Sequence, residues 1–185
     1  MNLRDIFLSI LIALLITIVG ALGWQLIIRN QLNSAPPEQM EVHNAVILDS
    51  VQDSKAVAQY VSDIHDRLNT LACYTEASLY SAEGAGWMFL KQDMSIINGR
   101  LDSIKPLVED AAFLEDMDNL SALLNIASEQ REYDALVYAH RIIHDLDYYV
   151  FKSPLSLAEP SDNWGATVTL EGLNSAAKRW LDARR

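Results

Sequence analysis

The stretch GWMFLKQDMSIINGRLDSIKP, residues 86–106, carries the most regular pattern in the chain. Its large apolar residues recur at steps of three and four, the spacing of one face of an α-helix packed against a partner. The members of this row are Trp87, Leu90, Met94, Ile97, Leu101 and Ile104. Pro106 ends the run, because proline lacks an amide hydrogen and clashes with the preceding turn. A helix over 87–104 is therefore predicted, with this row facing a core.

The same spacing occurs before this helix. From a helix start near Pro37 to about Ala82 the chain holds no proline or glycine, which predicts a long helix. Gly84 and Gly86 then mark a turn. The apolar face of this first helix consists of Val57, Val61, Ile64, Leu68 and Leu71. Because both rows follow the helical period, the two helices are predicted to form an antiparallel pair.

Two shorter helices are indicated next. One, over residues 106–113, would be opened by proline, which suits the first helical turn. The other, over 119–130, would be capped by Asp116, Asp118 or Asn119, whose short side chains can accept hydrogen bonds from free amides.

A last helix, over 132–151, carries a third apolar row at Leu136, Ala139, Ile143, Leu146 and Val150. The predicted fold class is therefore all-α, with an antiparallel bundle of about four helices over residues 38–152. Beyond it, residues 153–185 hold two prolines and two glycines, which indicates an irregular segment. Residues 167–170 have strand composition but are too few to build on, and 173–183 can close the chain with a short amphipathic helix.

The N-terminal segment IFLSILIALLITIVGALGWQLII, residues 6–28, contains 23 residues and no charge. As a helix it would extend about 34 Å, enough to cross a hydrocarbon core of about 30 Å. It continues past the small residues Val19, Gly20 and Ala21, so an uncleaved anchor fits better than a signal peptide. Residues 1–29 are thus predicted to be a single-pass transmembrane anchor in contact with membrane lipid.

Charges beside this segment set its expected orientation. Arg4 and the amino terminus precede it, Arg29 follows it, and the next basic residue is Lys55. The small excess of positive charge before the span favours a cytoplasmic N-terminus and an extracytoplasmic domain at the cell membrane. Residues 30–37 include Pro36 and Pro37 and are predicted to be a short, stiff spacer that holds the domain near the bilayer.

Charge and cysteine content exclude several classes of protein. The chain has 14 basic and 25 acidic residues. Three of these flank the apolar segment, which leaves 12 basic against 24 acidic side chains beyond it. Nucleic acid is not expected as a partner, because phosphate binding needs clustered basic residues. Cys73 is the single cysteine, so it cannot form an intramolecular disulfide, and it is interpreted as a small core residue rather than a reactive thiol.

Two clusters of charge have ordinary explanations. The acidic residues Glu109, Asp110, Glu115, Asp116 and Asp118 lack the glycine and ligand spacing of a calcium loop, so they are interpreted as a solvated face and helix-start acids. The basic residues Lys178, Arg179, Arg184 and Arg185 suit a helix C-terminus. They could also dock on the acidic body of the domain or on anionic lipid.

His140, His144 and Asp147 form the sharpest chemical pattern in the sequence. They lie at positions i, i+4 and i+7, so one helical face presents all three. Two histidines one turn apart can chelate Zn²⁺, and a carboxylate one turn further can add a third ligand. The HExxH glutamate is absent, since Arg141 follows the first histidine. A closed site would need a fourth ligand, for which His65 and His43 are candidates.

The sequence contains no GxGxxG, Walker A, GxSxG or CxxC motif. The first hypothesis is therefore a non-enzymatic, membrane-anchored module without a cofactor, for protein interaction or envelope assembly. Its partner would be a protein at the membrane surface, and a homo-oligomer is possible. The alternative is a metal-binding or metal-sensing bundle that holds Zn²⁺ or another transition metal through His140, His144 and Asp147. A hydrolase or lyase with a site assembled from distant residues is a third, weaker hypothesis.

Overall fold

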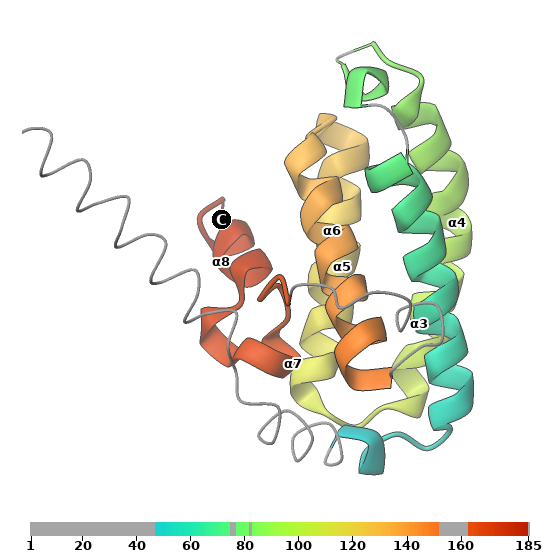
Figure 1. Ribbon diagram of the computed structural model, residues 1–185, viewed down its shortest axis with the longest axis vertical. Helices are drawn as coiled ribbons and strands as arrows, with labels where there is room; N and C mark the ends of the chain where they lie inside the picture. The colour runs from blue at the N-terminus through green and yellow to red at the C-terminus, as the bar shows by residue number, and fades with distance from the viewer. Residues whose placement is uncertain (1–46, 75–76, 82, 152–162, 185) are drawn as a thin grey trace, which may run out of the picture. The chain divides into compact units, whose positions relative to one another are not determined.

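A computed structural model describes residues 47–74, 77–81, 83–151 and 163–184 (Figure 1). The predicted anchor at residues 6–28 and the spacer at 30–37 lie outside these ranges. Within them, no helix combines the length and the apolar composition that crossing a membrane requires.

Four long helices run side by side in alternating directions (Figure 1). They are α3 (Ser54–Asn69), α4 (Gly86–Ile104), α5 (Ala111–Gln130) and α6 (Tyr133–Asp145). The described residues contain no named strand, and their one isolated β-bridge joins Val51 to Val108. The predicted all-α bundle is therefore confirmed for this part of the chain.

Helix α3 begins later than the sequence predicted. Residues 50–53 interrupt the expected long helix, because Val51 pairs with Val108 across the end of the bundle. The Asp53 carboxylate then accepts a hydrogen bond from the amide of Ala56 at 3.0 Å and caps α3. All five residues of the predicted apolar face are buried: Val57, Val61, Ile64, Leu68 and Leu71.

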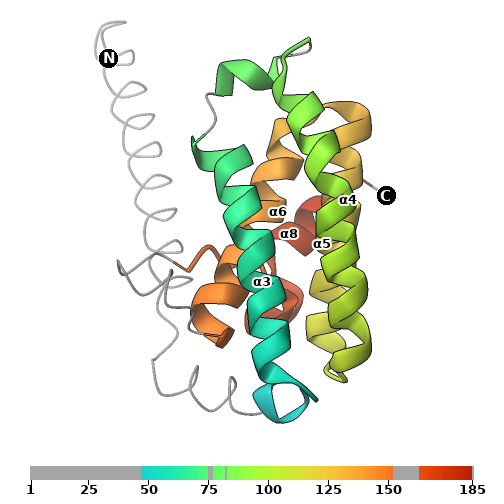
Figure 2. The ribbon, with the colours of Figure 1, turned by 90° about the vertical axis from the view of Figure 1, so that its right-hand side faces the viewer.

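The predicted turn and second helix are confirmed. Gly86 has no room for a side chain, since a Cβ there would lie 2.7 Å from the Tyr80 ring. Helix α4 then runs beside α3 (Figure 2) and ends at Ile104 before the proline. Its predicted row is buried, except that Met94 is only partly so.

Helix α5 shows where the prediction was wrong. One helix replaces the two expected over 106–113 and 119–130, and it begins at Ala111. The Asp110 carboxylate is the cap, because it accepts from the amide of Phe113 at 2.8 Å. Asp116 is not on a solvated face but fully buried in the middle of the helix.

The C-terminal segment lies against the flank formed by α5 and α6 (Figure 1). It contains α7 (Val168–Glu171) and α8 (Ala176–Asp182). The strand-like residues 167–170 are mostly helical because the buried Asp116 carboxylate accepts from the amides of Val168 and Thr169, at 2.6 and 2.8 Å. This pairing replaces the ladder that a strand would need.

Basic side chains of this segment dock on the acidic body of the domain. Lys178 pairs with Glu115 at 2.8 Å, and Arg184 pairs with Glu132 at 2.7 Å. The acidic body thus accounts for two of the four clustered basic residues without any lipid contact.

Candidate histidine cluster

Three histidines from two helices meet inside the bundle. His65 comes from α3, while His140 and His144 lie one turn apart on α6. The ring centroid of His65 is 5.5 Å from that of His140 and 5.2 Å from that of His144, and the two α6 rings are 5.9 Å apart. The α6 spacing was readable in the sequence, whereas the approach of His65 depends on the packing of α3 against α6.

His65 is oriented by Asp147. Its Nδ1 lies 2.6 Å from Oδ2 of Asp147, and both side chains are buried. Because a carboxylate only accepts, Nδ1 of His65 is the donor in this contact, and in a neutral ring Nε2 keeps the lone pair. That Nε2 is buried and has no hydrogen-bond partner among the described residues. Asp147, predicted from the sequence as a metal ligand, is thus placed as the partner of His65.

His144 has a comparable partner in Asp145. Its Nδ1 lies 3.3 Å from Oδ1 of Asp145, a carboxylate with no exposed surface. By the same reasoning Nδ1 of His144 is the donor in this contact, and in a neutral ring Nε2 keeps the lone pair.

His140 is held through its other nitrogen. Nε2 lies 2.7 Å from the amide oxygen of Asn69, so Nε2 donates and Nδ1 is the acceptor. Burial lowers the pKa of His140 to about 3, with further contributions from His65, His144 and Arg141. His140 is therefore neutral at physiological pH.

Cys73 follows the end of α3 and lies next to the ring of His140. Its Sγ lies 3.8 Å from each ring nitrogen of His140. The interpretation of Cys73 as a core residue was wrong, because the residue is exposed at the surface of the bundle. Its thiol group is nonetheless partly buried, and this burial raises the pKa of the thiol.

Two π-helical segments flank the cluster. The first, η1 (Thr70–Tyr74), extends α3 and carries Cys73, and the second, η4 (Leu146–Phe151), extends α6 and carries Asp147. Widened turns of this kind interrupt regular helices and frequently occur at functional sites. These widened turns could not be predicted from the sequence, because the apolar rows continue through both segments.

His140 contacts both Cys73 and Asn69, as the histidine of a Cys-His-Asn catalytic triad would. The electrostatics of these residues nevertheless oppose nucleophilic catalysis. Such a site needs a thiol of lowered pKa beside a basic imidazole. Here the pKa of the Cys73 thiol is raised, and that of His140 is lowered to about 3. The pair therefore stays a neutral thiol beside a weakly basic ring.

The side-chain atoms of the cluster that could bind a metal do not surround a common point. Among the described residues, no group of three or more histidine, cysteine or acidic side chains is arranged to hold a metal ion. The structure instead provides three imidazole rings whose centroids lie 5.2, 5.5 and 5.9 Å apart, each ring held at one nitrogen by a side-chain oxygen.

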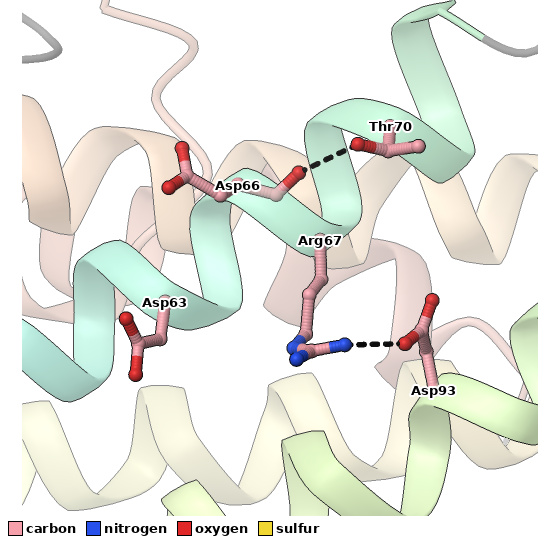
Figure 3. Close-up of a pocket in the computed structure, with 5 residues that line it drawn as sticks. All are labelled: Asp63, Asp66, Arg67, Thr70 and Asp93. Carbon is pink, nitrogen blue, oxygen red and sulfur yellow. Dashed lines mark hydrogen bonds and ion pairs between the residues drawn. The ribbon is translucent and has the colours of Figure 1, made fainter.

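A separate hollow of about 460 Å³ lies on another face of α3, towards α4 (Figure 3). It is lined by Asp63, Asp66, Arg67, Thr70 and Asp93. Arg67 pairs with Asp93 at 2.6 Å, and Arg100 pairs with Asp63 at 3.0 Å. These ion pairs neutralise two of the three carboxylates that line the hollow. The hollow is therefore a weaker candidate for a functional site than the histidine cluster.

Comparison with protein-family models, with curated proteins and with solved structures finds no match to this chain.

Proposed function

We propose that the protein is a membrane-anchored helical bundle that binds a transition-metal ion, such as Zn²⁺, at His65, His140 and His144. The observation that carries this proposal is the outer partner of each ring: Asp147, Asn69 and Asp145. Histidine ligands of metals almost always donate their second nitrogen to such a group, which fixes the tautomer and the ring orientation. Three histidines with this arrangement in one cluster favour a metal over a purely structural network.

The ring separations support the same proposal. With Zn–N bonds of about 2.0–2.1 Å and tetrahedral angles, two imidazole centroids on one ion lie about 5 Å apart. The observed separations of 5.2, 5.5 and 5.9 Å are close to this value. The nitrogens that the outer partners leave available for an ion are Nε2 of His65, Nδ1 of His140 and Nε2 of His144.

Cys73 is the proposed fourth ligand. A zinc ion bound to a sulfur at about 2.3 Å and a nitrogen at about 2.0 Å holds these atoms about 3.6 Å apart. Sγ of Cys73 is 3.8 Å from Nδ1 of His140. The raised thiol pKa is no obstacle, since a coordinating metal deprotonates the thiol outright. The neutral state of His140, which opposes catalysis, is the state that metal binding requires.

This ligand set differs from the one expected from the sequence. His140 and His144 are retained, and His65 is chosen from the two candidates for a further ligand, the other of which, His43, lies outside the described residues. Cys73 is added, and Asp147 acts through His65. Direct ligation by Asp147 would remove the carboxylate from His65, to which it is bonded at 2.6 Å.

The test is metal retention by the full chain purified in detergent. One zinc per chain after dialysis is expected, with a melting temperature that falls when a chelator is added. His65→Gln and Cys73→Ser should each lower the zinc content. Asp118→Asn, an exposed change beside Lys105, is the control and should leave it unchanged. Zinc-free wild-type protein, indifferent to the chelator, would refute the proposal.

A second candidate, an interaction module for a protein at the membrane surface, is supported by α4. Met88, Phe89 and Ile96 are large apolar residues left exposed on this helix, at 53%, 41% and 42%. A photo-crosslinking amino acid at Phe89 should capture a defined partner in the native membrane, while the same probe at exposed Asp118 should not. Equal, diffuse labelling from both positions would argue against a specific surface.

For either candidate the anchor at residues 6–28, the cytoplasmic N-terminus and the extracytoplasmic bundle remain part of the proposal. Their support is the uncharged apolar run and the charges beside it.

A further inference from the structure

Helix α4 has one face that packs on the bundle and an opposite face that the described residues leave uncovered. The row from Trp87 to Ile104 lies on the packed side, against α3 and α5 (Figure 2). The large apolar residues of the opposite face are exposed, and the exposed residues between and beyond them are uncharged. This face consists of Met88, Phe89, Gln92, Ser95, Ile96 and Gly99. Because soluble proteins rarely leave a continuous apolar stripe exposed, we expect a partner to cover it.

The four charged residues of α4 divide into two that are paired within the bundle and two that are not. Asp93 and Arg100 form ion pairs with residues of α3, at 2.6 and 3.0 Å. Lys91 and Asp102 are exposed and form no ion pair with another described residue. Their eleven-residue separation is close to three helical turns, so both lie on the same flank of the exposed face. One end of this flank is therefore positive and the other is negative.

We propose that the exposed face of α4 binds the same face of a second copy of the chain, with the two helices antiparallel. The two-fold axis would pass between Ile96 and Ile97, midway between Lys91 and Asp102. In a two-fold pair each contact occurs twice, so Lys91 of each copy lies opposite Asp102 of the other. In a parallel pair these two residues would be about 16 Å apart along the helices and could not meet. The inference rests on the second candidate function, since it names the partner of that surface.

Gly99 fits this pairing. Glycine within a helix is destabilising relative to alanine. A Cβ on Gly99 would meet no atom within 4 Å, so packing among the described residues does not require glycine at this position. In the antiparallel pair Ile96 of each copy lies beside Gly99 of the other. The missing side chain would then let the two helices approach closely.

The expected association is weak in dilute solution and stronger in a membrane. One helix face per copy offers less surface than the roughly 800 Å² per partner that a typical stable interface buries. Anchors at residues 6–28 would confine both copies to one surface and raise their effective concentration. The pairing should therefore be tested in the membrane, while dilute detergent should contain monomers.

The direct test is crosslinking of the full chain in its native membrane, with Cys73→Ser as the background. Chains carrying Lys91→Cys and Asp102→Cys, with different tags, are expressed together and treated with a short bis-maleimide. The two chains should be linked to each other, and the second pair of charges stays intact in this mixed dimer. Neither chain should be linked to itself, because equal positions would be about 16 Å apart along antiparallel helices.

Asn125→Cys, at an exposed position of α5, is the matched control and should give no linked dimer. Links between equal positions at Lys91→Cys and at Asp102→Cys, without the mixed link, would overturn the antiparallel pairing. Absence of any link, or equal linkage from Asn125→Cys, would overturn the dimer itself.

A charge-reversal cycle tests the ion pairs independently, with Ile96→Cys as the crosslinking site near the axis. Lys91→Asp and Asp102→Lys should each lower the linked fraction by at least about threefold, because like charges then face each other twice in every dimer. The double reversal should restore the linkage. Lys55→Asp, the same change at an exposed residue of α3, is the control and should have no effect. A double variant that links no better than the single variants would overturn the Lys91–Asp102 pairing.

The outcomes separate this inference from the function on which it rests. A photo-crosslinker at Phe89 that captures a second copy of the chain supports the dimer. Capture of one different protein, with no link between Lys91→Cys and Asp102→Cys, overturns the dimer and leaves the interaction module standing. Failure of both experiments overturns both.

Discussion

At the scale of single residues, Asp147 tests whether the carboxylates around the histidines tune a metal site. Asp147→Asn keeps the shape of the side chain but removes the charge that holds Nδ1 of His65. Loss of an outer partner of this kind typically costs about 10–100-fold in metal affinity. We expect that loss in a competition titration against a zinc chelator. An affinity equal to that of Asp118→Asn would show that His65 is not a ligand.

Asp116 gives a second prediction, about pH. Burial raises its pKa from 3.8 to about 7, in spite of its hydrogen bonds to the amides of Val168 and Thr169. The folded state therefore binds a proton that the unfolded state releases between these values. The stability that comes from this proton is present at low pH and is lost as pH rises through the window towards 7.

Asp116→Asn should remove this dependence, since asparagine does not titrate. Between pH 5 and 7, the unfolding free energy of the wild type relative to the variant should fall by up to about 1.4 kcal/mol per pH unit. Urea denaturation at several pH values measures this difference. Parallel curves for the two proteins would mean that Asp116 is ionised throughout, stabilised by its two amide donors.

Single residues of the cluster differed in how far the sequence could predict them. His140 and His144 share a helical face, so their spacing alone brought them together. His65, Asn69 and Cys73 come from another helix, and only the packing of α3 on α6 places them at the same point. Asp145 lies between His144 and Leu146 in the chain, and nothing local shows that its other partners are amides about twenty residues away.

At the scale of elements, apolar periodicity predicted α4 and α6 closely, whereas the proline and the candidate caps misplaced the start of α5. The apolar row from Trp87 to Ile104 is the face of α4 that packs into the core, so its spacing in the sequence predicts the helix directly. The start of α5 depends on which acidic residue finds a free amide, and Asp110, Asp116 and Asp118 are chemically equivalent in a sequence. Asp116 was taken for a cap because its true donors, in α7, are visible only in three dimensions.

Ile96 and Ile97 provide a matched test of the α4 register. Ile97 is fully buried, whereas Ile96 is 42% exposed. Ile97→Ala should destabilise the domain by about 2–5 kcal/mol, because it leaves a cavity in the core. Ile96→Ala should change stability by less than about 0.5 kcal/mol, as expected for a surface site. Similar losses in thermal or urea unfolding would show that α4 is rotated from the position described.

At the scale of the whole molecule, the single cysteine reports on membrane orientation. Cys73 is exposed in the bundle. A membrane-impermeant maleimide should therefore label intact cells if the domain is extracytoplasmic, and Cys73→Ser should abolish the labelling. Zinc added beforehand should slow the reaction, because a metal-bound thiolate is shielded. Labelling that appears only after permeabilisation would place the bundle in the cytoplasm.

The acidity of the molecule is consistent with both proposals but decides neither. An excess of negative charge beyond the anchor keeps a domain soluble near a surface and also raises the local concentration of cations. The specific feature is the inward-facing histidines, which the overall charge does not explain.

Zinc ligation by the histidine cluster is tested most directly by the zinc K-edge X-ray absorption spectrum of the metal-loaded full chain. We expect a four-coordinate ion with three imidazole nitrogens at about 2.0–2.1 Å and one sulfur at about 2.3 Å, and we expect the sulfur to disappear in Cys73→Ser. A shell of oxygen atoms without imidazole scattering, or a chain that retains no zinc to measure, would contradict it.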